Sequence, residues 1–326
     1  MSGTDFRQAP FRSLALGPVD VERTLRPDGS VLLRSRVPLG GYPRRLTEKV
    51  GEWATRAPER VFLARRGHPE RSGPWQTITY AEARDRMLAI AQSLLDRGLS
   101  AERGVCILSE NGLEHGLLAL ACLHAGIPYA PISPAYSLLS GDLAKLKSCL
   151  AAMNPGLVFA GDGTTYAKAL RAVAAGTELV VVERAPDDLK TTPFEAFLAA
   201  KPTAAVERAF EATGPDTVAK VLFTSGSTGS PKGVITTQRM LCSNLQQIGQ
   251  CFPCLGDKPP VFVDWLPWNH VFGGNHNFGL VLYNGGTLYI DDGRPTPAGL
   301  EQTVANLREV APTVYLNVPR GFADLV

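Results

Sequence analysis

Cysteine is scarce in this sequence, and its six cysteines are scattered along the chain. A small secreted domain stapled by disulfides would carry them densely and at even spacing, so this class is excluded and a reducing compartment fits. Cys251 and Cys254 form a C-x-x-C motif, but no second pair or H-x-H partner follows at zinc-site spacing. We therefore predict no metal-ligating residues.

Long hydrophobic runs and blocks of a single charge are also absent. The longest nearly apolar stretch, residues 116–132, contains His124 and two prolines, and no apolar leader stands at the N-terminus. The net charge is only +2, and basic residues are dispersed among acidic ones rather than clustered with aromatics. We therefore expect a cytoplasmic protein with no membrane and no nucleic-acid partner, and the sequence leaves its oligomeric state open.

Hydrophobic residues make up 44% of the 326 residues, enough for a large core. Short apolar runs alternate with segments of helical periodicity, which predicts an α/β fold of mostly parallel sheets covered by helices. We predict strands at 105–108, 157–160, 179–182, 218–223, 261–265, 287–290 and 314–318.

Two helices have clear boundaries in the sequence. Thr79 and Glu82 form a capping-box signature before apolar residues at helical spacing, and Gly98 supplies a stop. A second helix is predicted from Leu113 to His124, where we expect the histidines to have structural roles.

A loop rich in glycines and hydroxyls directly follows the predicted strand 218–223. Its three glycines allow backbone N–H groups to approach an anion, and its hydroxyls and one ammonium add further donors, as in a phosphate cradle. A flexible linker is the alternative, but it gives no reason for Pro-Lys-Gly after a strand. The residues predicted to bind the polyphosphate are Thr224, Ser225, Gly226, Ser227, Thr228, Gly229, Pro231, Lys232 and Gly233.

Three competing loop patterns fail on the same residues. A Walker A loop needs Gly before its Lys and Ser or Thr after it, whereas Lys232 lies between Pro and Gly. The dinucleotide fingerprint that could start at Gly161 has Tyr166 at its third glycine position. A nucleophile elbow around Ser227 has Ser225 in place of its first glycine.

A second segment, residues 265–279, combines aromatic and polar side chains with three glycines. Its aromatics could be core residues beside a loop, but asparagine and histidine side chains on so flexible a backbone favour a pocket. The residues predicted to line it are Trp268, Asn269, His270, Phe272, Gly273 and Gly274.

The run from Leu222 to Val234 resembles the phosphate-loop motif of the adenylate-forming enzymes, which include acyl-CoA synthetases, luciferases and peptide-synthetase adenylation domains. The block from Leu266 to Gly273 stands where that family carries its substrate-gating segment, and His270 aligns with the gate position. Residues 46–326 resemble the AMP-binding N-terminal domain continuously, whereas residues 1–45 form a lead segment without a clear counterpart.

The resemblance implies a two-step reaction. A carboxylate attacks the α-phosphorus of ATP to give an acyl-adenylate and pyrophosphate, and the acyl group then passes to CoA. It implies that Thr224, Lys232 and His270 take part in catalysis and that Mg²⁺ bridges phosphate oxygens. Residues 268–297 look most like feruloyl-CoA synthases, so the small-molecule substrate would be a ferulate-like acid. Enzymes that activate benzoic, fatty or amino acids share the loop and stay as alternatives.

Several later motifs of the family have no match before Val326, including its hinge and the lysine of its mobile C-terminal lid. Pro319, a favoured first-turn residue, predicts a helix that the chain end cuts short. We therefore expect an incomplete domain with little turnover by itself, either the front of an acid–thiol ligase or a ligand-binding remnant. Many relatives carry a histidine shortly after the loop, whereas this chain has Thr236-Thr237-Gln238, a difference to which the sequence assigns no role.

Overall fold

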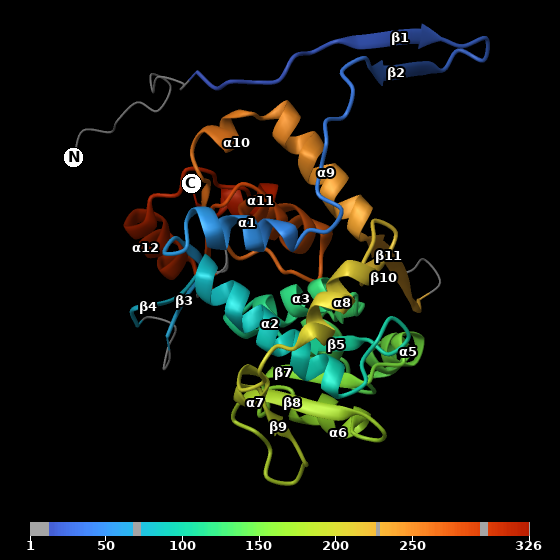
Figure 1. Cartoon of the computed structure of the whole chain (residues 1–326), viewed down its shortest axis with the longest axis vertical. Helices are drawn as coiled ribbons and strands as arrows, with labels where there is room; N and C mark the ends of the chain where they lie inside the picture. Colours follow the sequence, from blue (N-terminus) through green and yellow to red (C-terminus); the bar gives the residue numbers. More distant parts are fainter. Residues whose placement is uncertain (1–12, 68–72, 226–228, 294–298, 326) are drawn as a thin grey trace.

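The computed structural model of the chain describes residues 13–67, 73–225, 229–293 and 299–325, and Figure 1 shows its elements. The larger sheet has seven strands in the order β11-β10-β6-β5-β7-β8-β9. Only β11 is antiparallel to its neighbour. The strands are β5 (Val105–Leu108), β6 (Tyr129–Pro131), β7 (Leu157–Asp162), β8 (Glu178–Glu183), β9 (Thr192–Pro193), β10 (Val218–Ser225) and β11 (Pro231–Thr237).

The smaller sheet has four strands in the order β12-β13-β3-β4. Three of them are parallel and β4 is antiparallel to β3. They are β3 (Val61–Arg66), β4 (Trp75–Thr79), β12 (Val261–Asp264) and β13 (Thr287–Ile290). Mostly parallel sheets covered by helices confirm the predicted α/β fold.

The helices connect and cover these strands. They are α1 (Glu48–Arg56), α2 (Tyr80–Asp96), α3 (Leu113–Ala125), α4 (Pro134–Leu138), α5 (Ala144–Met153), α6 (Ala167–Val173), α7 (Glu195–Leu198), α8 (Ala204–Ala212), α9 (Gln238–Cys251), α10 (Cys254–Asp257), the π-helical turn η2 (Val271–Asn277), α11 (Phe278–Tyr283), α12 (Leu300–Val310) and α13 (Pro319–Ala323). Within the described residues, no helix combines the length and apolarity needed to span a lipid bilayer.

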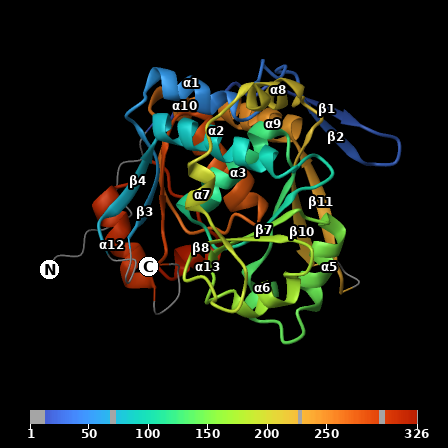
Figure 2. The same ribbon diagram turned by 60° about the horizontal axis from the view of Figure 1, so that its bottom comes forward.

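The core has two parts because strand side chains alternate between the faces of the larger sheet. Val105 and Ile107 of β5 belong to the cluster that includes α2 and α3, and this cluster continues into the smaller sheet. Cys106 and Leu108 point to the other cluster, under α5 and α6. Figure 2 shows the two groups of helices on opposite sides of the strands. The helices α2 and α3 therefore join the two sheets into one body.

Most of the predicted elements are confirmed. The capping box is present at the start of α2, where Thr79 Oγ1 accepts from Glu82 N at 3.2 Å and Thr79 N donates to Glu82 Oε2 at 2.8 Å. Gly98 has φ +67°, which suits a glycine just after a helix. Six predicted strands match β5, β7, β8, β10, β12 and β13, and Trp265 lies just beyond β12.

The predicted strand at 314–318 is wrong. These residues form no strand, although the N–H groups of Thr313 and Val314 both donate to Val261 O, at 3.0 and 3.3 Å. Farther along, Asn317 Oδ1 accepts from Val318 N at 2.8 Å immediately before α13 begins. Local side-chain bonds of this kind compete with ladder bonds, so an apolar run alone is insufficient for a strand here.

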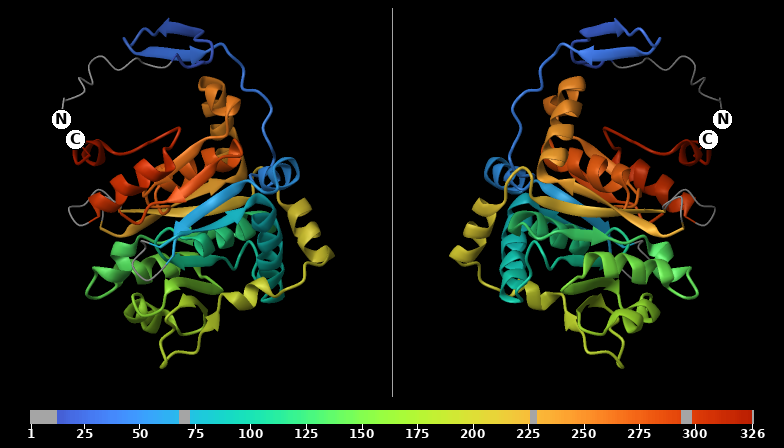
Figure 3. Two further views of the ribbon diagram at one scale, coloured as in Figure 1. Left: turned by 90° about the vertical axis from the view of Figure 1, so that its left-hand side faces the viewer. Right: turned by 90° about the vertical axis from the view of Figure 1, so that its right-hand side faces the viewer.

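The lead segment forms a hairpin of its own, β1 (Val21–Leu25) and β2 (Val31–Ser35), and all ten strand residues are exposed. Figure 3 shows this hairpin standing clear of the body. The chain on either side of it is bonded to α9: Gly17 N donates to Cys251 O at 3.0 Å, and Gly40 N donates to Gln250 Oε1 at 2.7 Å. The hairpin is thus attached at its base, with its strands open to solvent.

Candidate active site

The predicted phosphate loop is the turn between β10 and β11. In the register of this hairpin, Thr224 lies opposite Lys232 and Ser225 lies opposite Pro231. Thr224, Gly229, Lys232 and Gly233 are exposed, and Gly229 has φ +87°, a value that favours glycine. Gly226, Ser227 and Thr228 lie outside the described residues. The described donors therefore stand at the open end of a hairpin, where an anion has access to them.

The segment after β11 builds the start of α9. Thr237 is its N-cap, and the hydroxyl accepts from Met240 N at 3.3 Å. Gln238 is fully buried and bridges two distant segments, since its Oε1 accepts from Leu46 N and its Nε2 donates to Leu123 O, both at 3.0 Å. The residue to which the sequence assigned no role is thus a structural link behind the hairpin.

Parallel strands end at one edge of the larger sheet, and this edge collects the candidate site. Thr224 stands near the end of β10, and Ser133 and Ser109 follow β6 and β5, which run parallel in the same sheet. In open α/β sheets, ligands bind in crevices outside these carboxyl ends. Two cavities open along this edge and share Ser109 and Glu110.

One cavity, of about 220 Å³, lies between the carboxyl ends of the two sheets. Asn269 and His270 from the predicted pocket segment line it, and Asp291 and Asp292, which follow β13, were missed in the sequence. A parallel strand that ends in two acidic residues is the signal that could have indicated them. The lining consists of Ser109, Glu110, Asn111, Ser133, Pro134, Trp265, Pro267, Asn269, His270, Ile290, Asp291 and Asp292.

The other predicted pocket residues lie behind this cavity. Trp268 is 4% exposed and contacts the rings of His115 and Phe278 edge to face, both at 5.0 Å, so it packs in the core. Gly273 and Gly274 are part of η2, where a Cβ atom would collide with the backbone carbonyls of residues 266–268. Phe272 contacts the ring of His276 at 5.5 Å. Glycine is therefore needed for close backbone approach beneath the pocket.

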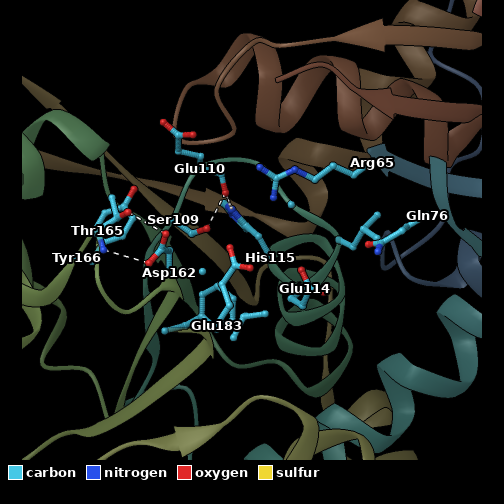
Figure 4. A pocket seen from close by; sticks show the side chains of 15 residues that line it. Arg65, Gln76, Ser109, Glu110, Glu114, His115, Asp162, Thr165, Tyr166 and Glu183 are labelled. Atoms are coloured by element: carbon cyan, nitrogen blue, oxygen red, sulfur yellow. Dashed lines mark hydrogen bonds between the residues drawn. The ribbon is translucent and has the colours of Figure 1, made fainter. Parts of the chain in front are cut away.

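The second cavity, of about 310 Å³, lies at the carboxyl ends of β5, β7 and β8 and was not predicted. Figure 4 shows Arg65 and Gln76 on one side of it and Asp162 and Thr165 on the other. Arg65 lines this cavity and also forms a bidentate pair with Asp292, at 2.9 and 2.6 Å. Since Asp292 lines the first cavity, the ion pair stands between the two.

Two ionisable side chains of the strands are almost completely buried. Lys220 of β10 is 2% exposed, and burial lowers its pKa to about 7. Asp264 at the end of β12 is also 2% exposed, and burial raises its pKa to about 7. Burial likewise lowers the pKa values of His115 and His124 to about 4, so both imidazoles are neutral at physiological pH.

No group of three or more metal-ligating side chains occurs among the described residues. Cys251, the last residue of α9, and Cys254, the first residue of α10, are free thiols, and the other four cysteines are free as well. Asp291 is occupied by protein donors: it accepts from Thr303 Oγ1 at 2.7 Å and from Asn306 Nδ2 at 2.8 Å.

The sequence profile described as "AMP-binding enzyme" matches residues 50–326. The chain belongs to this family. The predicted relation to the adenylate-forming enzymes is thereby confirmed, and the fold is that of their N-terminal domain.

Two curated relatives illustrate the range of the family. The chain is 28% identical over 223 residues to a 3-[(3aS,4S,7aS)-7a-methyl-1,5-dioxo-octahydro-1H-inden-4-yl]propanoyl:CoA ligase of Rhodococcus jostii, covering 65% of this chain and 42% of that one. It is 27% identical over 238 residues to a 4-hydroxyphenylalkanoate adenylyltransferase of Mycobacterium marinum, covering 70% and 35%.

Two solved structures share the fold. The fatty acyl-adenylate ligase from L. pneumophila, in complex with acyl adenylate and pyrophosphate, gives a TM-score of 0.62 at 20% identity, covering 82% of this chain and 42% of that one. ATP-bound MatB from Rhodopseudomonas palustris gives 0.63 at 22% identity, covering 85% and 50%. The chain thus spans half or less of the length of each of these relatives.

Proposed function

We propose that this chain carries the phosphate loop and part of the acid pocket of an ATP-dependent acid–thiol ligase. The acid would be aromatic and ferulate-like, activated as an acyl-adenylate and released as its CoA thioester. The division into a lead segment, residues 1–45, and an incomplete AMP-binding domain, residues 46–326, is part of this proposal.

One observation carries the proposal: the hairpin with Thr224 and Lys232 and the cavity with Asn269 and His270 lie along one carboxyl edge of the sheets. A carboxylate and a triphosphate repel each other, so an enzyme that joins them must place both and neutralise charge between them. An edge that brings polyphosphate donors and a polar cavity to the same side of the molecule suits this task.

The loop residues would act on the phosphates. The Lys232 ammonium, the Thr224 hydroxyl and the Gly229 N–H would bind the β- and γ-phosphates, with Ser225, Gly226, Ser227 and Thr228 completing the loop. Pro231 and Gly233 would set the direction in which the chain leaves the turn. Charge on the non-bridging oxygens would then be neutralised as the carboxylate approaches the α-phosphorus.

Mg²⁺ fits this site as a companion of ATP rather than as a resident metal. Magnesium commonly keeps several waters and binds through substrate phosphates and one or two carboxylates. Two carboxylates that line the 220 Å³ cavity, here called the acid cavity, are engaged, Asp292 with Arg65 and Asp291 with Thr303 and Asn306. The ion would therefore arrive on the triphosphate, and CoA would enter as the second co-substrate.

The cavity combines flat apolar walls with polar groups, as a ferulate-like acid requires. Trp265, Pro267 and Ile290 supply apolar surface, and Asn269 and His270 supply polar atoms. Trp265 Nε1 is buried without an acceptor among the described residues, so a substituent of the acid could accept from it. His270, exposed at the N-cap of η2, would stand at the mouth between acid and nucleotide.

The test is acid-dependent ATP–pyrophosphate exchange by the product of the complete reading frame. Ferulate, p-coumarate, benzoate and a saturated fatty acid are compared at equal concentrations. Exchange that is fastest with ferulate or coumarate supports the proposal. Faster exchange with the fatty acid overturns the aromatic part, and the absence of exchange with all four acids overturns the ligase.

ATP binding by the 326-residue chain is measured in parallel with the exchange assay, and the Lys232→Ala variant of the chain is the control. Weak ATP binding that Lys232→Ala abolishes supports a phosphate loop that is formed in this chain. ATP binding without exchange by either protein favours the second candidate, a ligand-binding remnant.

A further inference from the structure

Lys220 has a place in the fold that the reaction described above does not use. It lies on β10, four residues before Thr224, and its neighbours across the sheet are Thr236 of β11 and Tyr129 of β6. No carboxylate among the described residues acts on its pKa, which burial alone lowers, and its ammonium stands 5.5 Å from the centre of the Tyr129 ring. Burying a cation without a counter-charge costs folding free energy, so a specific contact is expected to hold Lys220 in this position.

The Lys220 side chain donates to a backbone carbonyl of η2, its one hydrogen-bond partner within the part of the chain that the structure describes. Lys220 Nζ donates to Gly274 O at 3.0 Å across 54 residues of sequence. A π-helical turn departs from the regular i→i+4 ladder, and such turns are frequent at functional sites. The N-cap of this turn is His270, which lines the acid cavity. One bond thus joins the strand of the phosphate loop to the turn that presents His270.

The other sheet contacts the far end of the same turn. Asp264 ends β12, and the Asn277 side chain, the last of η2, faces its carboxylate and favours the charged form. Asn277 is completely buried, so this contact lies in the protein interior. The turn is therefore enclosed between one ionisable group from each sheet, and of the two only Lys220 makes a direct bond to its backbone.

We propose that Lys220 is a positioning residue, which fixes η2 and with it His270 relative to the strand that carries the phosphate loop. The inference rests on the proposed function, because it assigns to Lys220 the alignment of the acid with the triphosphate. Lys220 touches neither reactant in this arrangement. Its effect is on the rate at which a correctly bound pair reacts, since displacements of about 1 Å lower rates by about 100-fold.

The test replaces the ammonium with an apolar side chain of similar length, Lys220→Met. In the full-length protein we expect acid-dependent pyrophosphate exchange to lose about 10- to 100-fold in kcat, while the KM for ATP changes by less than about twofold. Folding stability should stay equal or rise, because replacing a buried ion by an apolar group is often neutral or stabilising. The control is Lys201→Met, the same change at an exposed lysine.

Amide hydrogen exchange in residues 271–277 is measured in the same variants and separates the two parts of the inference. Faster exchange there in Lys220→Met, with β10 unchanged, supports the bond as the constraint on η2. Unchanged exchange overturns it, and faster exchange with unchanged kinetics overturns the positioning role. If the wild-type protein activates no acid, the proposed function fails, and hydrogen exchange still decides whether Lys220 fixes the turn.

Should Lys220→Met fail to fold, Asp264→Asn provides the second variant, since it alters the contact at the other end of η2 and keeps the size of the side chain. A fall in kcat without a change in the KM for ATP is again expected. Loss of ATP affinity instead of kcat in either folded variant overturns the inference, because it would place the effect on nucleotide binding.

Discussion

The hairpins β1–β2 and β10–β11 each pair two antiparallel strands that follow one another in the sequence, but only the second is part of a larger sheet. β10 pairs with β6 as well as with β11 and contributes Leu222 and Phe223 to the interior. The strands of β1–β2 are exposed on every residue. A turn that must place donors against an anion needs such support, because an isolated two-stranded hairpin is marginally stable in water.

The largest difference should appear when one apolar side chain is removed from each hairpin. Phe223→Ala deletes a ring that is 7% exposed and packs in the cluster under α5 and α6. We expect it to lower the free energy of unfolding by about 3–5 kcal/mol. Leu33→Ala in β2, where the side chain is 65% exposed, should change it by less than about 0.5 kcal/mol. Urea denaturation of both variants measures the contrast, and equal losses would contradict it.

A charge removed from each hairpin tests function rather than stability. Lys232→Ala, opposite Thr224 at the end of β10–β11, should raise the KM for ATP and slow adenylation, lowering kcat/KM by about 10- to 100-fold. This range corresponds to the loss of one charge-assisted hydrogen bond, worth about 1.5–3 kcal/mol. Arg34→Ala in β2 is the matched variant and should leave the kinetics unchanged. Unaltered kinetics in Lys232→Ala would make the loop merely structural.

This contrast could be predicted only in part from the sequence. The capping box of α2 is confirmed because its residues act locally. The phosphate loop could be predicted for the same reason, since glycine, hydroxyl and lysine at fixed spacing carry their chemistry locally, and it stays a prediction. Strands with strong apolar runs could also be predicted from the sequence. The strand at 314–318 was mispredicted because Asn317 bonds to the backbone beside it, a contact that apolar periodicity does not report.

Fewer residues of the proposed acid cavity could be predicted from the sequence, because contacts between distant segments form the cavity. Asn269 and His270 line it, whereas Trp268 of the same segment packs in the core, and neighbouring residues of one loop give no signal of that division. Asp292 also lines the cavity, and it forms an ion pair with Arg65, which is 227 residues away in the sequence. The positioning role proposed for Lys220 depends equally on a backbone carbonyl 54 residues away.

The two hairpins should also differ in how they affect the pH dependence of stability, since β10 carries a buried ionisable group, Lys220, and every described residue of β1 and β2 is exposed. Burial lowers the pKa of Lys220 from 10.5 to about 7, so between pH 7 and 10.5 the unfolded chain binds a proton that the folded chain does not. Stability should therefore rise with pH in this window, by about 1 kcal/mol between pH 7 and 8. Chemical denaturation at several pH values checks this. The rise attributed to Lys220 should vanish in Lys220→Met and persist in Arg34→Met, a variant of the exposed hairpin.

The smallest effect is expected when the exposed hairpin is removed altogether. Arg36 N donates to Asp20 O at 2.9 Å, so the two ends of the hairpin are adjacent and residues 21–35 can be replaced by a short glycine link. The bonds of Gly17 and Gly40 to α9 remain, and every strand residue that is lost was exposed. We expect the free energy of unfolding to change by less than about 0.5 kcal/mol and ATP affinity to stay unchanged. A larger loss of stability, or a change in the number of associated chains measured by light scattering, would mean that the hairpin packs against a partner surface. The hairpin β1–β2 would then be supported by packing, as β10–β11 is.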